Sequence, residues 1–448
     1  MGKLFGTDGV RGIANTELSC ELAYKIGRTG GYILTKGKDR PKIVIGMDTR
    51  ISGSMLEGAV SAGLNSAGID VLYAGLLPTP AVACLIRELD ADGGIMISAS
   101  HNPVEYNGIK FFDSKGFKLP DEMEEEIENI ILEGSDIGYY PVDFHVGRKI
   151  ELDDPGKIYM DFLEKTVKAD FSGLKIAMDC GNGAAYRVAP ELIFKLGAEV
   201  YVINKQPNGI NINVNSGSTH PEVIQQLVRD TGADIGLSFD GDADRLIAVD
   251  EKGNIIDGDH IMAVCGTYLK DRNKLQNNTI VGTVMSNMGL DLCLDKKDIS
   301  VVKTQVGDRY VIEEMKKSGH VLGGEQSGHI IFLEHNTTGD GLLTALQLIE
   351  AVREQKKPLS ELSSIMTTMP QVLINAKVEN SNKHSYMEDS VIEDSIKKLE
   401  EEFHGAGRVL IRPSGTEPLV RVMIEGENEE DIRKKASELA LLIENRLG

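Results

Sequence analysis

Cysteine is scarce in this chain of 448 residues, and tryptophan is absent. The five cysteines lie far apart and form no Cys-x-x-Cys pair, which excludes a secreted disulfide framework and the usual zinc-site spacing. No hydrophobic run approaches the roughly 18 residues of a membrane span, and the N-terminus lacks the apolar segment of a signal peptide. We therefore expect a reduced, soluble protein that works in the cytoplasm.

Positive charge is also in short supply. The chain has 48 Lys and Arg against 69 Asp and Glu, which gives a formal net charge of −21. A field of this sign repels nucleic acid and anionic membranes, so we expect neither as a partner. It would also repel a phosphorylated metabolite, so a site for such a ligand would need cations concentrated around it.

The chain is too long for a single hydrophobic core, because cores usually stop growing near about 250–300 residues. Short Val- and Ile-rich runs alternate with amphipathic stretches of helix length, which is typical of parallel βαβ units. Three of these runs, 42–46, 174–178 and 279–284, are followed by a polar or glycine-containing turn that opens a helix. The pattern predicts three related α/β domains.

Composition indicates where the domains meet. Residues 134–155 mix Gly, Pro and Asp without periodicity, so we expect a linker there. Further boundaries are expected near 251–258, where a Lys-Gly-Asn hairpin signal occurs, and near 357–370. The expected domains are 1–150, 151–255, 256–370 and 371–448.

The last domain is expected to be a smaller α+β unit. Strands are predicted over 372–378, 408–412 and 419–425, with a helix over 389–403. A final helix presents one apolar face. That face consists of Ile432, Ala436, Leu439, Ala440, Ile443 and Leu447.

Three aspartates alternate in a tight turn directly after the apolar run 234–239. Asp240, Asp242 and Asp244 can converge on one hard cation, because Mg²⁺ and Ca²⁺ prefer oxygen ligands. An EF-hand is excluded, since its sixth position requires glycine and holds Arg245 here, and a β-prone stretch follows the loop. An acidic surface turn is the alternative, but three ligands with room for a phosphate oxygen favour Mg²⁺ in phosphoryl transfer.

Ser100 lies in a polar turn, SASHNP at 98–103, after the apolar run 94–97. A hydroxyl at a strand end beside His101 is well placed to be presented on a turn, although such clusters more often only make turns. A serine-hydrolase elbow is excluded, because no Gly-x-Ser-x-Gly surrounds the residue.

A second polar turn, RPSGTEP at 412–418, is a candidate phosphate site. Glycine permits close backbone approach, two hydroxyls donate hydrogen bonds, and Arg412 and Arg421 supply positive charge, which is what a phosphate dianion needs. A plain Pro/Gly hairpin is the alternative. The arginines would supply the local cations that the net charge requires.

Two further loops are polar. GTDGVRG at 6–12 is glycine-rich with one arginine but matches neither a dinucleotide fingerprint nor a Walker loop. GGEQSGH at 323–329 lies between two apolar runs and could hydrogen-bond a sugar ring. Taken alone, each could be a structural loop.

Six segments in order resemble the α-D-phosphohexomutase superfamily and, within it, the bacterial phosphoglucosamine mutases. They are GTDGVRG at 6–12, ISASHNPVEYNGIKFF at 97–112, GSTHPE at 217–222, DGDADR at 240–245, GGEQSGH at 323–329 and RPSGTEPLVRVM at 412–423. The resemblance spans the whole chain. It implies three related α/β domains with mixed sheets plus a smaller C-terminal α+β domain, heart-shaped around a central cleft.

The resemblance also implies a role for each motif. Ser100 would be the phosphoserine and would bind Mg²⁺ together with Asp240, Asp242 and Asp244. The reacting phosphate would be lined by Arg11, Lys110 and Arg245. The sugar hydroxyls would be held by Glu325 and Ser327. The non-reacting phosphate would be held by Arg412, Ser414, Gly415, Thr416 and Arg421. Proton transfer would fall to Lys110, His101 or His329, which the sequence does not rank.

The implied reaction interconverts glucosamine 6-phosphate and glucosamine 1-phosphate through glucosamine 1,6-bisphosphate, on the way to UDP-N-acetylglucosamine and the cell wall. The expected partner is a small phosphosugar, and a homodimer is an alternative to a monomer. Rival interpretations are a phosphomannomutase/phosphoglucomutase, a non-catalytic phosphosugar-binding regulator, and a phosphatase. Gln326 and the GSTHPE motif favour the amino sugar, and the joint presence of Ser100, the three aspartates and Arg412 argues against a regulator.

Three positions depart from the family pattern. Ala243 replaces the second glycine of the commoner DGDGDR, which would cost about 1 kcal/mol if that residue needs a positive φ. Met47 stands where arginine is usual, which removes one cation. Cys180 precedes Gly181-Asn182, where Ala-Asn is commoner.

Overall fold

The structure, a computed structural model, describes residues 4–6, 8–414 and 417–448. Its contacts divide the chain into two compact units. One consists of Met1–Met285 and Asp298–Ile365, and the other of Ser286–Lys297 and Met366–Gly448. Among the described residues, no helix combines the length and the apolar character needed to span a bilayer.

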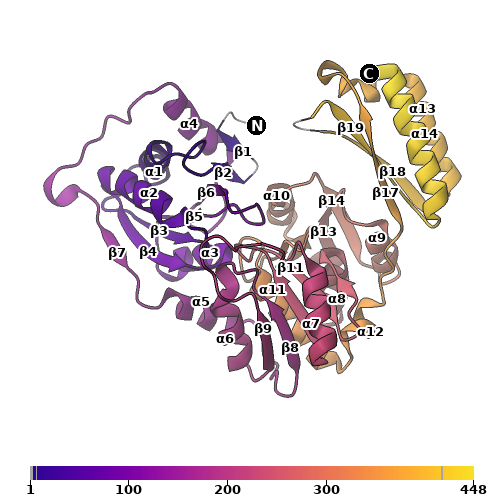
Figure 1. The fold of residues 1–448 in the computed structure, drawn as a ribbon, viewed down its shortest axis with the longest axis horizontal. Helices are drawn as coiled ribbons and strands as arrows, with labels where there is room; N and C mark the ends of the chain where they lie inside the picture. Colours follow the sequence, from indigo (N-terminus) through magenta and orange to yellow (C-terminus); the bar gives the residue numbers. More distant parts are fainter. Residues whose placement is uncertain (1–3, 7, 415–416) are drawn as a thin grey trace. The chain divides into compact units, whose positions relative to one another are not determined.

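The first sheet has seven strands in the order β1-β2-β6-β5-β3-β4-β7 (Figure 1). The strands are β1 Phe5–Gly6, β2 Gly9–Ile13, β3 Lys42–Met47, β4 Asp70–Leu76, β5 Gly93–Ile97, β6 Tyr106–Phe112 and β7 Lys149–Glu151. The helices that accompany them are α1 Cys20–Leu34, α2 Gly53–Ser66, α3 Thr79–Glu88 and α4 Asp121–Leu132.

The stretch 134–155, predicted as a linker, is irregular over most of its length. It also contains β7, which the prediction missed and which pairs in parallel with β4, so that the stretch extends the first sheet. The strand has only three residues, of which only Ile150 is apolar, so no alternation marks it in the sequence.

The second sheet has the order β12-β11-β10-β8-β9, and the third the order β14-β13-β15-β16. Their strands are β8 Lys175–Asp179, β9 Glu199–Ile203, β10 Ile235–Phe239, β11 Leu246–Asp250, β12 Ile255–Ile256, β13 Thr279–Thr283, β14 Ser300–Thr304, β15 Leu322–Gly324 and β16 Ile330–Phe332. The helices are α5 Pro155–Glu164, α6 Val188–Lys195, α7 Pro221–Thr231, α8 Gly258–Asp271, α10 Asp308–Ser318, α11 Gly341–Gln355 and α12 Leu359–Ser363.

All three sheets contain the same four-strand unit. Its order is β4-β3-β5-β6 in the first sheet, β9-β8-β10-β11 in the second and β14-β13-β15-β16 in the third. In each unit the first three of these strands are parallel and the last is antiparallel to its neighbour. The mixed sheets and the relatedness of the three α/β units are thus confirmed.

The fourth sheet is antiparallel, in the order β17-β19-β18, and lies in the second unit. Its strands are β17 Gln371–Lys377, β18 Gly407–Pro413 and β19 Leu419–Gly426, and its helices are α13 Ser390–Phe403 and α14 Glu429–Leu447. All six apolar residues predicted for the final helix are buried. The α+β prediction is confirmed.

Helix α9, Met288–Asp295, also belongs to this second unit. The connection is a fully buried carboxylate, Glu425 of β19. It accepts hydrogen bonds from Asn287 Nδ2 (3.2 Å), from the Met288 backbone N–H (3.1 Å) and from Arg408 Nε (2.5 Å). Three donors therefore compensate the cost of burying this charge.

Close packing of α1 on α2 depends on glycine. A Cβ on Gly63 would lie 2.3 Å from the Tyr24 carbonyl oxygen, and one on Gly27 would lie 2.5 Å from the Val60 carbonyl oxygen. Both contacts are with backbone atoms, so a side chain at either position would push the helices apart. Gly58, also within α2, has no atom within 4 Å of its would-be Cβ.

Gly63→Ala should therefore lower the free energy of unfolding by about 1–2 kcal/mol, because overpacking outweighs the gain in helix propensity. The matched control Gly58→Ala should raise it by about 0.5–1 kcal/mol, because alanine is the better helix former and nothing obstructs it. Scanning calorimetry of both variants measures the difference. Equal stabilisation by both substitutions would contradict the packing.

Candidate active site

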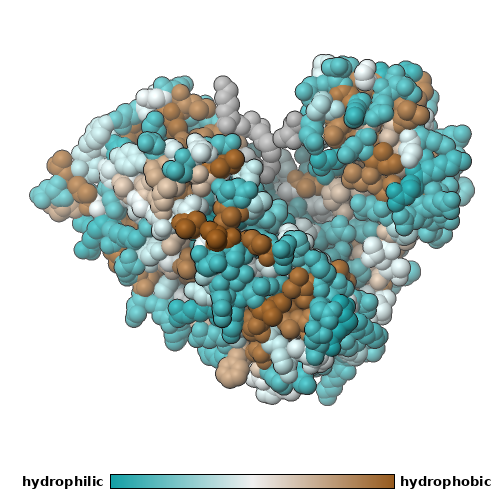
Figure 2. Space-filling view, in the orientation of Figure 1, coloured by the Kyte–Doolittle hydropathy of each residue, from teal (hydrophilic) through white to brown (hydrophobic). Residues whose placement is uncertain are grey.

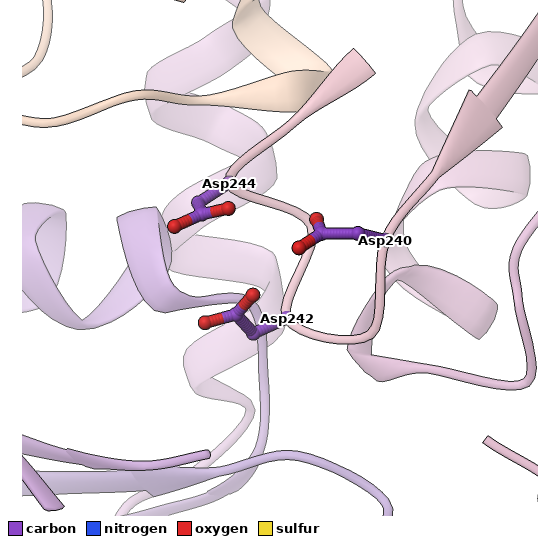
Figure 3. A group of neighbouring side chains, drawn as sticks. All are labelled: Asp240, Asp242 and Asp244. Carbon is purple, nitrogen blue, oxygen red and sulfur yellow. The ribbon is translucent and has the colours of Figure 1, made fainter. Parts of the chain in front are cut away.

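The aspartate turn lies between β10 and β11 and gathers three buried carboxylates. Figure 3 shows Asp240, Asp242 and Asp244 pointing toward one another from this loop. One oxygen from each lies within 4.8 Å of the others. Like charges this close repel strongly, so the cluster needs compensating cations.

Part of the compensation comes from Lys110 of β6, which is almost fully buried. Its Nζ lies 2.8 Å from Asp242 Oδ2, 3.0 Å from Asp8 Oδ2 and 3.9 Å from Asp244 Oδ2. Burial alone would lower the pKa of this lysine, but the carboxylates of Asp242 and Asp8 outweigh it and raise the pKa. The ammonium group is therefore held in its charged form.

The rest of the negative charge is only partly compensated, by Arg245 Nε at 3.8 Å from Asp244 Oδ1 and by His329 Nδ1 at 3.5 Å from Asp244 Oδ2. Asp242 Oδ1 and Asp244 Oδ1 are buried, and neither has a hydrogen-bond partner among the described residues. Burial and the neighbouring carboxylates of Asp244 and Asp242 raise the pKa of Asp240. Orphaned oxygens in an all-carboxylate cluster are what a hard divalent cation requires, so these residues fit Mg²⁺.

The backbone of the loop is strained as anticipated. Ala243 has φ +54°, in the left-handed region, so the substitution of glycine by alanine does carry a cost of about 1 kcal/mol. The Ala243 N–H donates to the Asp240 carbonyl (3.1 Å), and its carbonyl accepts from Gly341 N–H (3.0 Å). These bonds hold the alanine in its unfavourable conformation.

Ser100 follows β5 and lies directly beside the aspartate loop. Its Oγ donates to Asp240 Oδ2 at 2.6 Å and lies 3.2 Å from His101 Nδ1. The residue is buried and, like Ala243, has a positive φ, +52°. The structure thus brings the predicted serine and the predicted metal ligands together, across 140 residues of sequence.

Two arginines of the site retain free donors. Arg11 of β2 binds Asp8 through Nη2 (2.5 Å), and Arg245 lies 3.8 Å from Asp244 Oδ1 through Nε. The Nε atoms of Arg11 and Arg245 are nevertheless buried without a hydrogen-bond partner in the described part of the chain. Unsatisfied guanidinium donors beside a carboxylate cluster suit an anion such as phosphate.

The two histidines differ in their surroundings. His101 is half-buried, and burial together with the guanidinium groups of Arg245 and Arg11 lowers its pKa to about 4. His329 is buried; its Nε2 accepts the Gly339 N–H at 3.1 Å, and its Nδ1 lies 3.5 Å from Asp244 Oδ2. Both nitrogens of His329 are therefore engaged within the protein.

The loop 325–329 between β15 and β16 occupies the same place in the third sheet as the serine and aspartate loops in the first two. Its backbone is tied down, because Leu246 N–H donates to the Gly328 carbonyl and Gly258 N–H to the Gln326 carbonyl, each at 3.0 Å. Glu325 Oε1 accepts the Gly307 N–H (3.1 Å), and Ser327 is exposed.

The second unit carries the predicted phosphate turn. Arg412 and Arg421 lie directly opposite each other on β18 and β19, and Arg421 Nη2 lies 3.5 Å from Glu417 Oε2. Ser414 is buried; its Oγ accepts the Glu417 N–H (3.1 Å), and its carbonyl accepts from Lys383 Nζ (2.7 Å). Gly415 and Thr416 lie outside the described residues.

Several residues at the site had no role among the sequence-based predictions. Thr79, the first residue of α3, donates to Asp242 Oδ2 at 2.6 Å. Lys118 bridges Asp8 and Asp308, and so joins the first α/β domain to the third. Of these residues, only Asp8 lies in one of the six motifs, GTDGVRG. Thr79, Lys118 and Asp308 lie outside all six, so the sequence did not mark them as site residues.

Four family descriptions match the chain in succession. They are phosphoglucomutase/phosphomannomutase domain I over residues 2–137, domain II over 157–253, domain III over 257–369 and the C-terminal domain over 373–442. The chain belongs to the phosphoglucomutase/phosphomannomutase family.

Within this family, curated relatives of high identity share one activity. The phosphoglucosamine mutases of Alkaliphilus metalliredigens and Acetivibrio thermocellus are 61% and 60% identical, and each covers 100% of both chains. The chain is thus one of the phosphoglucosamine mutases, which are isomerases.

Solved structures share the fold. A phosphoglucomutase/phosphomannomutase family protein from Burkholderia thailandensis has a TM-score of 0.80 at 25% identity, covering 97% of each chain. The N-acetylphosphoglucosamine mutase of Aspergillus fumigatus, solved in complex with GlcNAc-6P and magnesium, has a TM-score of 0.69 at 16% identity, covering 99% of this chain and 95% of that one.

The carboxylate cluster generates a prediction about metal binding. In EDTA, Asp240→Asn should unfold at a temperature equal to or above that of the wild type. Burial and the carboxylates of Asp244 and Asp242 raise the pKa of Asp240, so its ionised form is unfavourable in the folded protein and the neutral amide avoids that cost. Added Mg²⁺ should raise the melting temperature of the wild type and leave that of Asp240→Asn unchanged. Differential scanning fluorimetry and titration calorimetry measure both effects.

The control for this experiment is Asp230→Asn, an exposed position on α7. It should keep the full response to Mg²⁺. An undiminished Mg²⁺ response in Asp240→Asn, or none in the wild type, would contradict the assignment of the cluster as a metal site.

Proposed function

We propose that the chain interconverts glucosamine 6-phosphate and glucosamine 1-phosphate, with Ser100 as the carrier of the phosphoryl group. The main support is that Ser100 Oγ lies 2.6 Å from Asp240 Oδ2 in a buried cluster of charged groups. Among the described residues of that cluster, one oxygen each of Asp242 and Asp244 and the Nε atoms of Arg11 and Arg245 have no hydrogen-bond partner. A metal ion and a phosphate would together satisfy both sets. The full-length identity to phosphoglucosamine mutases supports the amino sugar over the neutral-sugar alternative.

The reaction balances as two transfers. In the first, the free hydroxyl of the sugar phosphate attacks the phosphorus of phospho-Ser100, the bond from phosphorus to Oγ breaks, and glucosamine 1,6-bisphosphate forms. In the second, Ser100 Oγ attacks the other phosphate of the bisphosphate, which releases the isomeric monophosphate. Both transfers need charge neutralisation and in-line alignment more than covalent assistance.

Mg²⁺ would be held by Asp240, Asp242 and Asp244 together with the phosphate on Ser100, and it would neutralise charge that develops on the transferred group. Arg11, Lys110 and Arg245 would bind the equatorial oxygens of that group. Because Lys110 is already fixed by Asp242 and Asp8, it would supply a positioned charge that requires little reorganisation.

Two protons must move, and we propose a separate carrier for each. His101 Nδ1, 3.2 Å from Ser100 Oγ, would return a proton to that oxygen when it leaves and take it when it attacks. The proton of the sugar hydroxyl would pass to Lys110 or His329. Both already bind carboxylates, so exchange with substrate would have to compete with those contacts.

The sugar and its second phosphate would be held elsewhere. Glu325 and Ser327 would bind the sugar hydroxyls. Arg412, Ser414, Gly415, Thr416 and Arg421 would bind the phosphate that does not react. The placement of the two arginines opposite each other supports this role, because it concentrates positive charge at the turn.

Other features of the protein are also proposed. The domain boundaries 1–150, 151–255, 256–370 and 371–448 each enclose one family match. Cytoplasmic location agrees with five free cysteines. The homodimer is proposed on an exposed apolar patch. Between α4 and β7, apolar side chains gather at the left edge of Figure 2, and Tyr140, Val142 and Phe144 are 66%, 71% and 66% exposed.

Replacing Ser100 tests the proposed carrier. Ser100→Ala should abolish turnover of glucosamine 6-phosphate, because it removes the oxygen that would carry the group beside Asp240. The control Ser114→Ala, exposed in the turn after β6, should retain wild-type activity. A coupled assay and phosphoprotein mass spectrometry measure the two effects; an active Ser100→Ala variant would refute the proposal.

The phosphate turn generates a second test. Arg421→Gln should raise KM for glucosamine 6-phosphate by roughly tenfold or more, since a charge-assisted bond to phosphate is lost. Without ligand the free energy of unfolding of the same variant should stay within about 0.5 kcal/mol of the wild-type value, because the substitution relieves the repulsion with Arg412 and also removes the exposed ion pair with Glu417. Arg433→Gln, on the exposed side of α14, is the matched control and should change neither quantity. A wild-type KM in Arg421→Gln would rule out the phosphate role.

A further inference from the structure

The backbone of Ser100 is held in an unfavourable conformation. A non-glycine residue at φ +52° costs roughly 1–2 kcal/mol relative to the right-handed region. Such strain persists only where surrounding contacts impose it. The contacts made by the two peptide groups that flank the Ser100 Cα show what imposes it here.

On the amino side, the Ser100 N–H donates to Ser98 Oγ at 2.9 Å. The Ser98 hydroxyl in turn donates to Asp48 Oδ2 at 2.6 Å. All three residues are buried. The amide of Ser100 is therefore linked, through one hydroxyl, to the carboxylate of Asp48.

On the carboxyl side, the Ser100 carbonyl accepts two hydrogen bonds. They come from Arg50 Nη2 at 2.8 Å and from Asn213 Nδ2 at 2.9 Å. Gly241 approaches the same oxygen so closely that a Cβ there would lie 2.5 Å away. The carbonyl is thus enclosed by groups from three separate segments of the chain.

The contacts of the Ser100 amide lead to Asp48 and those of its carbonyl lead to Arg50, and these two residues form an ion pair. Arg50 Nε lies 2.9 Å from Asp48 Oδ2, and the side chains of both residues have no solvent exposure. The guanidinium also donates to the carbonyls of Asn102 (2.9 Å) and Pro103 (2.6 Å). One planar fork therefore binds a carboxylate and three carbonyls of a single turn, which an ammonium group cannot reproduce.

We propose that the Asp48–Arg50 ion pair, with Asn213, is the positioning device that fixes the backbone of Ser100 so that its Oγ faces Asp240. Arg50 is a positioning residue, since it contacts the carrier's backbone and not the transferred group. The proposal rests on the proposed role of Ser100. With its backbone fixed, Ser100 Oγ would lie at the same place in both transfers. The sugar would present one of its phosphate positions to that oxygen in the first transfer and the other in the second.

Arg50→Lys tests the device. It keeps a positive charge beside Asp48 but loses the fork to the three carbonyls. We expect kcat to fall on the order of 100-fold, as a displacement of about 1 Å at a reacting atom produces. KM for glucosamine 6-phosphate and Mg²⁺ affinity should change less than threefold, because the guanidinium of Arg50 is occupied by Asp48 and by the carbonyls of the serine turn. Arg148→Lys, whose side chain is 71% exposed, is the control and should behave as the wild type.

Asn213→Ala provides a second, milder variant that leaves the ion pair in place. It should lower kcat by roughly tenfold, again with KM unchanged, since one of two bonds to the Ser100 carbonyl remains. In both variants carrying prepared phosphoserine, the ratio of phosphate lost to water over phosphate passed to sugar should rise. A merely structural role would not move this partition.

The outcomes separate the two proposals. Wild-type kcat in both variants, or kcat falling only in step with melting temperature and KM, overturns the positioning role. If Arg50→Lys fails to fold, the kcat, KM and melting temperature of Asn213→Ala alone test the positioning role. Activity in Ser100→Ala would instead overturn the carrier itself, whereas an inactive Ser100→Ala with a fully active Arg50→Lys would overturn only this inference.

Discussion

The rest of the active site depends on the repulsion among three carboxylates, those of Asp240, Asp242 and Asp244, which lie within 4.8 Å of one another. In a buried setting their repulsion cannot be left to solvent, so positive charge has to be brought from elsewhere in the chain. Lys110 supplies one charge from the first sheet, and Asp8 and Thr79 help to order the groups around it. Two carboxylate oxygens, Asp242 Oδ1 and Asp244 Oδ1, have no hydrogen-bond partner among the described residues, which suits a divalent metal ion.

Repetition of one strand arrangement explains why the functional loops converge. The serine, aspartate and glutamate loops each connect the third and fourth strands of the same four-strand unit. A loop at that point follows a parallel strand and precedes an antiparallel one, so it lies at the carboxyl edge where α/β sheets bind ligands. Three copies of one unit therefore present three chemically different loops in equivalent places.

Much of this could be predicted from the sequence. The aspartate turn, the serine turn and the two apolar strands before them are local signals, and their elements formed as expected. Arg50 and Asn213 could not be predicted in the same way, because their contacts with Ser100 span 50 and 113 residues and involve its backbone carbonyl. The role of Lys118 could not be predicted for a similar reason, since its partner Asp308 lies 190 residues away. The strand β7 was missed because three residues carry no periodicity.

The central claim is that Ser100 passes its phosphoryl group directly to the sugar, and transfer of a label measures this most directly. Enzyme phosphorylated on Ser100 with radioactive phosphate would be mixed with unlabelled glucosamine 6-phosphate and quenched on the millisecond scale. If Ser100 is the carrier, label should leave Ser100 and appear in glucosamine bisphosphate at least as fast as steady-state turnover. Label that leaves Ser100 more slowly than turnover, or that appears first as inorganic phosphate, would contradict this role.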